Sequence, residues 1–219
     1  MLAAGLPVTE AATVRLVAAI PETRIAISST AGGGTARTDR TAPNQYEAAG
    51  QTIPSAALDG DELDIKTLYL TVSAGGAIPA TGIHELEIWI GEWSSATNTA
   101  GTELMRESFD VAGIHFIDDG IYAFDFTTVF SFSADTDYAM QLWWTTDDAS
   151  HSISWARDNG GNSIEGGFLS LKDSGLSLPF DAAPQEVNDL FFAFETVPEP
   201  SAVLLAGLGI GLLASRRRR

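Results

Sequence analysis

The residues best suited to bind a metal ion lie in one short acidic stretch, residues 59–64 (DGDELD). It holds Asp59, Asp61, Glu62 and Asp64, and carboxylate oxygens are the ligands that calcium prefers. The stretch lacks the glycine and the distal glutamate of an EF-hand loop. We therefore expect either a calcium site on Asp59, Asp61 and Asp64 or a solvated acidic turn, and no other cofactor.

Tryptophan is the second residue type that could bind a ligand. The chain has five, on or beside apolar stretches: Trp89, Trp93, Trp143, Trp144 and Trp155. Adjacent residues of a strand point to opposite faces, so Trp143 and Trp144 cannot both face one core, and one of them is exposed or lies under a loop. An exposed indole can stack on a sugar ring. Trp89 and Trp143 are our candidate sugar contacts, and the alternative is that the tryptophans fill the core.

No arrangement of residues marks a catalytic centre. The histidines lack the close spacing of a zinc site: His84, His115 and His151. Cysteine is absent, which excludes a thiol nucleophile and disulfides. No Gly-x-Ser-x-Gly motif occurs, and the many carboxylates, such as Glu85, Glu87 and Asp125, include no pair that stands out. We expect a protein that is not an enzyme; the alternative is a secreted polysaccharide hydrolase with an unidentified carboxylate pair.

The charge balance argues against nucleic acid as a partner. The 219 residues contain 12 Lys and Arg against 29 Asp and Glu, which gives a formal net charge of −17. Four of the cations are the last four residues, so the rest of the chain carries 8 − 29 = −21. A surface this negative repels phosphate. We expect no nucleic acid among the partners.

Alternating apolar and polar residues predict strands through the middle of the chain. Four stretches show this period most clearly: residues 66–73, 84–93, 121–133 and 138–146. In the first, Leu68, Leu70 and Val72 form one face, and Gly- and Asp-rich turns separate the stretches. No convincing amphipathic helix occurs between residues 41 and 195, which excludes α/β enzyme folds. We expect an all-β fold, an antiparallel β-sandwich of jelly-roll type.

The last 23 residues combine a proline-flanked glutamate, an apolar run and a basic end. The sequence runs from Val197, Pro198, Glu199, Pro200 and Ser201 through the uncharged residues 202–214 to Arg216, Arg217, Arg218 and Arg219. As a helix, the apolar run would reach about 20 Å, against about 30 Å of membrane hydrocarbon. We expect a short C-terminal hydrophobic helix whose arginines stay on the cytoplasmic side, with the body of the protein outside.

These three parts, in this order, resemble the PEP-CTERM sorting signal. The resemblance implies transient anchoring in the inner membrane of Gram-negative bacteria that make exopolysaccharide. It also implies recognition of Pro198, Glu199 and Pro200 by exosortase, a membrane protease-transpeptidase that cleaves near them. The protein would then reside at the cell surface or outside the cell, where exopolysaccharide is a candidate partner. The alternative is a tail anchor that is retained.

An exported protein is expected to carry an N-terminal secretory signal, and residues 1–16 (MLAAGLPVTEAATVRL) do not have its usual form. They contain no Lys or Arg before Arg15, and Pro7 and Glu10 interrupt the apolar start. We interpret residues 1–11 as the end of a signal whose true start lies upstream, with cleavage after Ala11 or Ala12. The alternative is a disordered or non-classically exported N-terminus.

These observations divide the chain into three parts: residues 1–45, an N-terminal segment with a possible signal remnant and a flexible, glycine-rich lead-in; residues 46–196, the β-sandwich; and residues 197–219, the sorting signal. The stretch FSFSADTDYAMQLWW followed by SISWARDNGG resembles the secreted choice-of-anchor sandwich domains, most of which have no assigned activity. We expect an exported surface or extracellular-matrix protein that is structural or carbohydrate-binding.

Overall fold

The computed structural model describes residues 11–21, 25–28, 34–42, 45–58, 62–146, 152–158, 164, 166–173, 177–185 and 188–197. Apart from one 3-10 helix, η1 (Ser55–Leu58), the elements in these ranges are strands. In chain order they are β1 (Thr13–Val17), β2 (Ile25–Ser28), β3 (Gly34–Ala42), β4 (Gln45–Ile53), β5 (Leu63–Ala74), β6 (Gly76–Ala77), β7 (His84–Ser94), β8 (Thr99–Asp110), β9 (His115–Phe116), β10 (Ile121–Phe132), β11 (Tyr138–Thr146), β12 (Ser152–Arg157), β13 (Gly167–Asp173) and β14 (Phe192–Thr196). The expected all-β class is confirmed.

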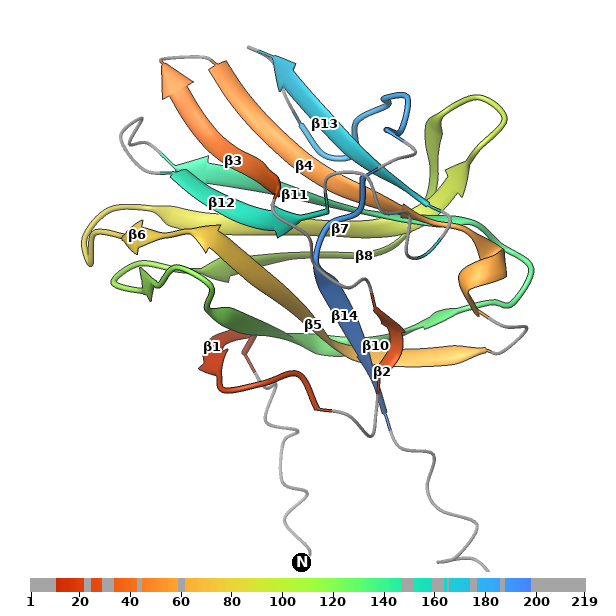
Figure 1. The fold of residues 1–219 in the computed structure, drawn as a ribbon, viewed down its shortest axis with the longest axis horizontal. Coiled ribbons are helices and arrows are strands. Elements are labelled where there is room, and N and C mark those ends of the chain that lie inside the picture. Colours follow the sequence, from red (N-terminus) through yellow and green to blue (C-terminus); the bar gives the residue numbers. More distant parts are fainter. Residues whose placement is uncertain are drawn as a thin grey trace, which may run out of the picture.

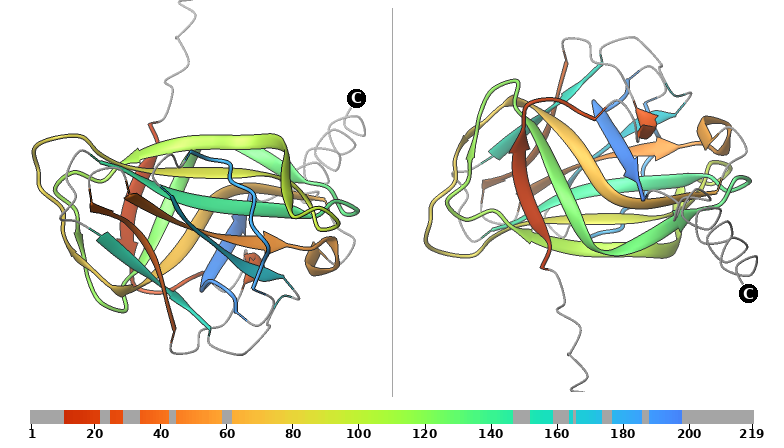
Figure 2. Two further views of the ribbon diagram at one scale, coloured as in Figure 1. Left: turned by 90° about the horizontal axis from the view of Figure 1, so that it is seen from above. Right: turned by 90° about the horizontal axis from the view of Figure 1, so that it is seen from below.

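The strands form two layers (Figure 1, Figure 2). One layer has the order β2-β14-β5-β10-β1, and the other contains β13, β4, β11, β7 and β8, with β3 beside β4 and β12 beside β3. β12 also pairs with the end of β5 and so joins the layers. The pairings between described strands are antiparallel, which confirms the antiparallel sandwich. Its jelly-roll connectivity stays a prediction, and residues 202–214, expected to form a helix, lie outside the described residues.

The main core lies between the layers and follows the predicted alternation. Leu68 and Leu70 of β5 are buried in one cluster with Ile88 and Ile90 of β7, which belongs to the other layer. Burial of such side chains is the main stabilising contribution in a fold of this kind. The second face of β5 is covered too, since Tyr69 is only 1% exposed and packs with residues of β10 and β14.

The sandwich begins before residue 46, where the sequence predicted its start, because three strands of the sheet precede that residue. β1 pairs with β10 from Thr13↔Asp125 to Val17↔Ile121, and β2 pairs with β14. β3 lies between β12 and β4. The described residues before 46 therefore belong to the sandwich, where they pair backbone groups of β10, β14 and β12 that would otherwise need other partners.

Candidate functional site

The last described strand runs directly into the proline-glutamate-proline stretch. β14 ends at Thr196, and the backbone N–H of Val197 still donates a hydrogen bond to the carbonyl of Asp64, at 2.8 Å. β14 pairs with β5 on one side, from Phe192↔Leu70 to Thr196↔Ile65, and with β2 on the other. Val197 is thus held at the end of the sheet, whereas Pro198, Glu199, Pro200, Ser201 and the four terminal arginines lie outside the described residues.

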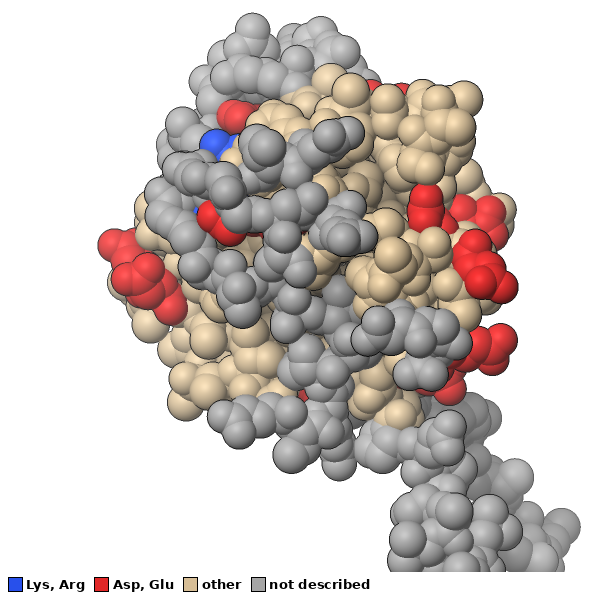
Figure 3. Space-filling view, turned by 45° about the vertical axis from the view of Figure 1, so that its right-hand side comes forward, with Lys and Arg blue, Asp and Glu red and all other residues tan. Residues whose placement is uncertain are grey.

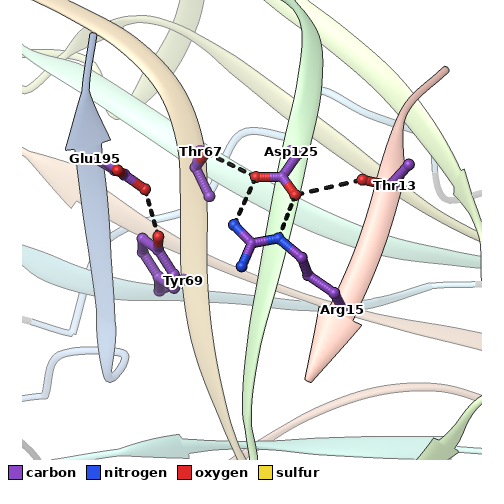
Figure 4. A network of polar contacts seen from close by, with 6 residues as sticks. All are labelled: Thr13, Arg15, Thr67, Tyr69, Asp125 and Glu195. Carbon is purple, nitrogen blue, oxygen red and sulfur yellow. Dashed lines mark hydrogen bonds and ion pairs between the residues drawn. The ribbon is translucent and has the colours of Figure 1, made fainter. Parts of the chain in front are cut away.

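A network of polar side chains ties the strands next to this junction together (Figure 4). Arg15 of β1 binds Asp125 of β10 with two hydrogen bonds, from Nε to Oδ2 at 2.7 Å and from Nη2 to Oδ1 at 3.1 Å. Thr67 of β5 donates to Oδ1 at 2.8 Å, and Thr13 of β1 donates to Oδ2 at 3.3 Å. One carboxylate therefore connects three neighbouring strands.

A second contact in the same region fixes β14 to β5. The hydroxyl of Tyr69 in β5 donates a short hydrogen bond to Oε2 of Glu195, the residue before the last one in β14 (Figure 4). Burial of the phenol, followed by the hydrogen bond to the Glu195 carboxylate, raises the pKa of Tyr69 to about 12. The tyrosine stays protonated and remains a donor at neutral pH, so the contact holds the strand that carries the tail.

The network stabilises the pairing of β1, β10 and β5. Burial raises the pKa of Asp125, but the hydrogen bonds from Arg15 and Thr67 together outweigh it, and the net pKa lies below its ordinary value. A general acid needs the opposite shift. A pocket of about 270 Å³ adjoins the carboxylate and is lined by Ala11, Thr13, Lys66, Asp125 and Phe126.

The two candidate sugar contacts are not exposed rings. Trp89 is 0% exposed, which corrects its assignment as a surface platform for a sugar. Its ring lies so close to Gly91 that an added Cβ there would come within 2.4 Å of Cζ2 of Trp89, so glycine makes room for the indole. Trp143 is half-buried and packs against the apolar cluster that contains Trp89. Its neighbour Trp144 is fully buried in the main core. The expectation that the pair would face opposite ways is confirmed.

The cover over Trp89 is the segment 177–185, which we call the strap. Two strap residues, Leu178 and Phe180, are buried with Trp89 and Trp93 in a second apolar cluster on the outer side of β7 and β11. The fully buried Gln141 of β11 fixes the strap, because its side chain donates from Nε2 to the carbonyl of Phe180 and accepts from the N–H of Phe180, both at 2.8 Å. Arg106 adds a hydrogen bond to the carbonyl of Leu178 at 2.8 Å.

The metal candidates do not gather into a site within the described ranges. Asp59 and Asp61 lie outside those ranges, and Asp64 is exposed and accepts a hydrogen bond from Ser131 at 2.5 Å. Among the residues that the structure describes, no group of three or more His, Asp or Glu could hold a metal ion. Calcium binding at residues 59–64 stays a prediction.

The structure also assembles a pocket that sequence reasoning missed. It has a volume of about 250 Å³ and lies where β4, β7 and β11 meet their turns, with Trp93, Asn98 and Asp137 among its lining residues. Its lining residues come from segments that are far apart in the sequence, so no motif of closely spaced residues predicts the pocket. The turn sequences around Asn98 and Asp137 were the only available signal.

The chain was compared with known protein families and structures. Residues 196–219 match the family model of the PEP-CTERM protein-sorting motif, which confirms the resemblance for this part of the chain. No curated protein matches the chain. Two similar solved structures come from the infectious bursal disease virus Gx strain (13% identity, TM-score 0.21, 96% of this chain and 51% of that chain) and from the Yersinia pseudotuberculosis-derived mitogen (13% identity, TM-score 0.18, 54% of this chain and 90% of that chain). The chain thus spans about half the length of the viral chain, and likeness at this level carries no argument about function.

The PEP-CTERM motif implies export through an exosortase-sorted pathway to the cell surface, with anchored transit through the membrane. Within the described ranges, no helix has the length and apolar character needed to cross a membrane.

Proposed function

We propose that this protein is a non-catalytic β-sandwich of the cell surface or extracellular matrix that is delivered by exosortase-type sorting and acts there as a structural or carbohydrate-binding module. The observation that carries the proposal is the match of residues 196–219 to the PEP-CTERM motif. In this proposal exosortase cleaves near Pro198, Glu199 and Pro200, and the cleaved tail includes the four terminal arginines.

The geometry of the junction supports a removable tail. Thr196 is the last residue of β14, and the described strands all lie before it. Cleavage near Pro198 therefore removes no described strand. The contact between Tyr69 and Glu195 holds β14 in the sheet up to the residue before its end, so the sandwich should survive the cut.

The non-catalytic part of the proposal draws support from the carboxylates with shifted pKa values. Asp125 and Asp137 both have pKa values below the ordinary one, and each is engaged by hydrogen-bond donors through both of its oxygens. Carboxylates ionised in this way do not act as general acids at neutral pH, and their hydrogen bonds to neighbouring strands and turns stabilise the fold.

The test compares processing in a host that has an exosortase with processing in the same host after its deletion. In the first host, we expect surface or secreted protein whose mass shows a C-terminus near residues 198–201. After deletion of the exosortase, or in the Glu199→Ala variant, the protein should stay in the inner membrane with its terminal arginines. Asp135→Ala removes an exposed carboxylate elsewhere and should be processed like the wild type.

Two results would refute the proposal. Surface material that keeps the terminal arginines in the exosortase host would show that the tail is a permanent anchor. Release of reducing ends from host exopolysaccharide by the purified protein would show that it is a hydrolase.

A further inference from the structure

The pocket at the ends of β4, β7 and β11 has walls from several separate segments. Five apolar or small residues form much of its lining: Ile53, Pro54, Tyr138, Gly166 and Pro184. The polar side chains come from the turn between β7 and β8, from the residue before β11 and from Thr52 of β4, whose hydroxyl is paired with the backbone of Gly167. At about 250 Å³, the pocket lies below the range of about 300–1,000 Å³ that is typical for drug-sized ligands, so it suits one small ring.

Trp93 supplies an apolar surface to the pocket. It is 6% exposed, and its indole Nε1 has no partner among the described residues. Trp89 and Trp144 also have unpartnered Nε1 atoms, but neither lines the pocket. Because the Nε1 atom of Trp93 is itself buried, a ligand in the pocket does not reach it, and Trp93 contributes the apolar surface of its ring.

Asp137 supplies a fixed acceptor. Its Oδ1 accepts from the backbone N–H of Ser55 at 2.9 Å, and its Oδ2 accepts from the hydroxyl of Ser95 at 3.0 Å. Burial raises the pKa of Asp137, but these hydrogen bonds together lower it further, so the group is ionised at neutral pH. Each oxygen keeps a lone pair for a ligand hydroxyl.

Asn98 adds an amide that can both donate and accept. Its backbone has φ = 56°, a conformation that asparagine tolerates better than most residues, and its N–H bonds to the carbonyl of Ser94 at 2.7 Å. The turn thus explains the residue type but does not use the side chain. Within the described ranges, the Asn98 amide makes no hydrogen bond, which leaves it free for a ligand.

The charged groups of the pocket favour a neutral ligand over an anion. Among its described lining residues there is no Lys or Arg to bind an anion, and Asp137 would repel one. The surface in Figure 3 also shows acidic side chains at its edges and few basic ones, in line with the net charge of −17. A metal ion would find only one carboxylate among these residues, and an apolar ligand would leave the polar groups without partners.

We propose that this pocket binds a single neutral sugar residue, with Asn98 donating to one of its hydroxyl oxygens, Asp137 accepting from its hydroxyl groups and Trp93 forming part of the apolar wall. A sugar ring matches the pocket because each hydroxyl both donates and accepts, while the C–H face of the ring can lie against the apolar walls. The inference rests on the proposed function, since it gives the carbohydrate-binding module a site and a ligand class.

The test measures binding of D-glucose, D-galactose, D-mannose and D-glucuronate to the purified full-length chain in detergent by saturation-transfer NMR and calorimetry. We expect at least one neutral sugar to bind at millimolar concentration and glucuronate to bind more weakly. Asn98→Gly suits the positive φ but removes the amide, and should weaken binding about 2- to 10-fold, the range expected for one neutral hydrogen bond.

Asp119→Gly is the matched control, because Asp119 also has a positive φ, of 58°, but lies outside the pocket. It should leave the affinity for the sugar unchanged. The inference is overturned if none of the neutral sugars binds, if glucuronate binds as well as they do, or if the control loses as much affinity as Asn98→Gly. Sorting of the protein in its host would be unaffected by any of these results, so this inference can fail while the proposed sorting stands.

Discussion

The role of the strap can be tested by removing the side chain that holds it. Gln141→Met keeps the approximate size of the side chain but deletes both hydrogen bonds to Phe180, each of which measures 2.8 Å. Each bond contributes about 1 kcal/mol net, and the stranded N–H and C=O of Phe180 would cost about 1–3 kcal/mol each if they stayed buried. If the strap detached instead, Leu178 and Phe180 would lose burial worth about 1.5–3 kcal/mol each.

Either outcome lowers the free energy of unfolding, and we expect a loss of about 2–5 kcal/mol. Urea unfolding followed by tryptophan fluorescence measures it, since Trp89 and Trp93 lie in the cluster that the strap covers. A shift of their emission to longer wavelength before the main transition would show that the strap leaves first. Limited proteolysis should then cut within residues 177–185.

Gln185→Met is the matched control, because it makes the same substitution at an exposed strap residue, where the side chain accepts one exposed hydrogen bond from Asn188 at 3.2 Å and does not bind Phe180. Its effect should stay within about 0.5 kcal/mol, as for most surface substitutions. If Gln141→Met cost less than about 1 kcal/mol and left the emission maximum unchanged, the glutamine would not be what holds the strap over the indoles.

Two further predictions concern the network beside the sorting motif. Arg15→Met should lower the free energy of unfolding at neutral pH by about 0.5–1 kcal/mol, because the ion pair with Asp125 is partly exposed. The pKa of Asp125 in the folded protein lies below its ordinary value of 3.8. The stability difference between wild type and Arg15→Met should therefore be complete above pH 3.8 and disappear as the pH falls through the folded pKa. Urea unfolding at a series of pH values measures it. The stability of the wild type should also fall as the pH rises from 10.0 to about 12, because Tyr69 ionises in the unfolded chain before it ionises in the folded one. Tyr69→Phe should show a shallower decline over that range, and an identical slope in the two proteins would contradict the assignment.

The strands of the middle of the chain could be predicted because their pattern is local. The alternation of Leu68, Leu70 and Val72 implies a strand with one buried face wherever the segment lies in the fold, and the structure buries all three. The strands before residue 46 could not be predicted in this way. β3 (GTARTDRTA) is mostly polar and has no alternation, and it is a strand because β12 and β4 pair with its backbone.

The burial of Trp89 and the pocket at Trp93 depended on contacts between distant segments. Period-two alternation correctly places Trp89 on the face of β7 opposite Ile88 and Ile90, but it does not show that the strap covers that face. The pocket likewise needs the turn at Asn98 to meet Asp137, which lies before another strand.

The sequence by itself determined the all-β class, the strand faces and the sorting motif, because each follows from a short run of neighbouring residues. Only the tertiary structure decided which outward-facing side chains are covered, which carboxylates accept structural hydrogen bonds and where a pocket lies. Those properties depend on segments that meet in space across long loops, and the free energy of such contacts is set by burial and hydrogen-bond partners that no single stretch contains.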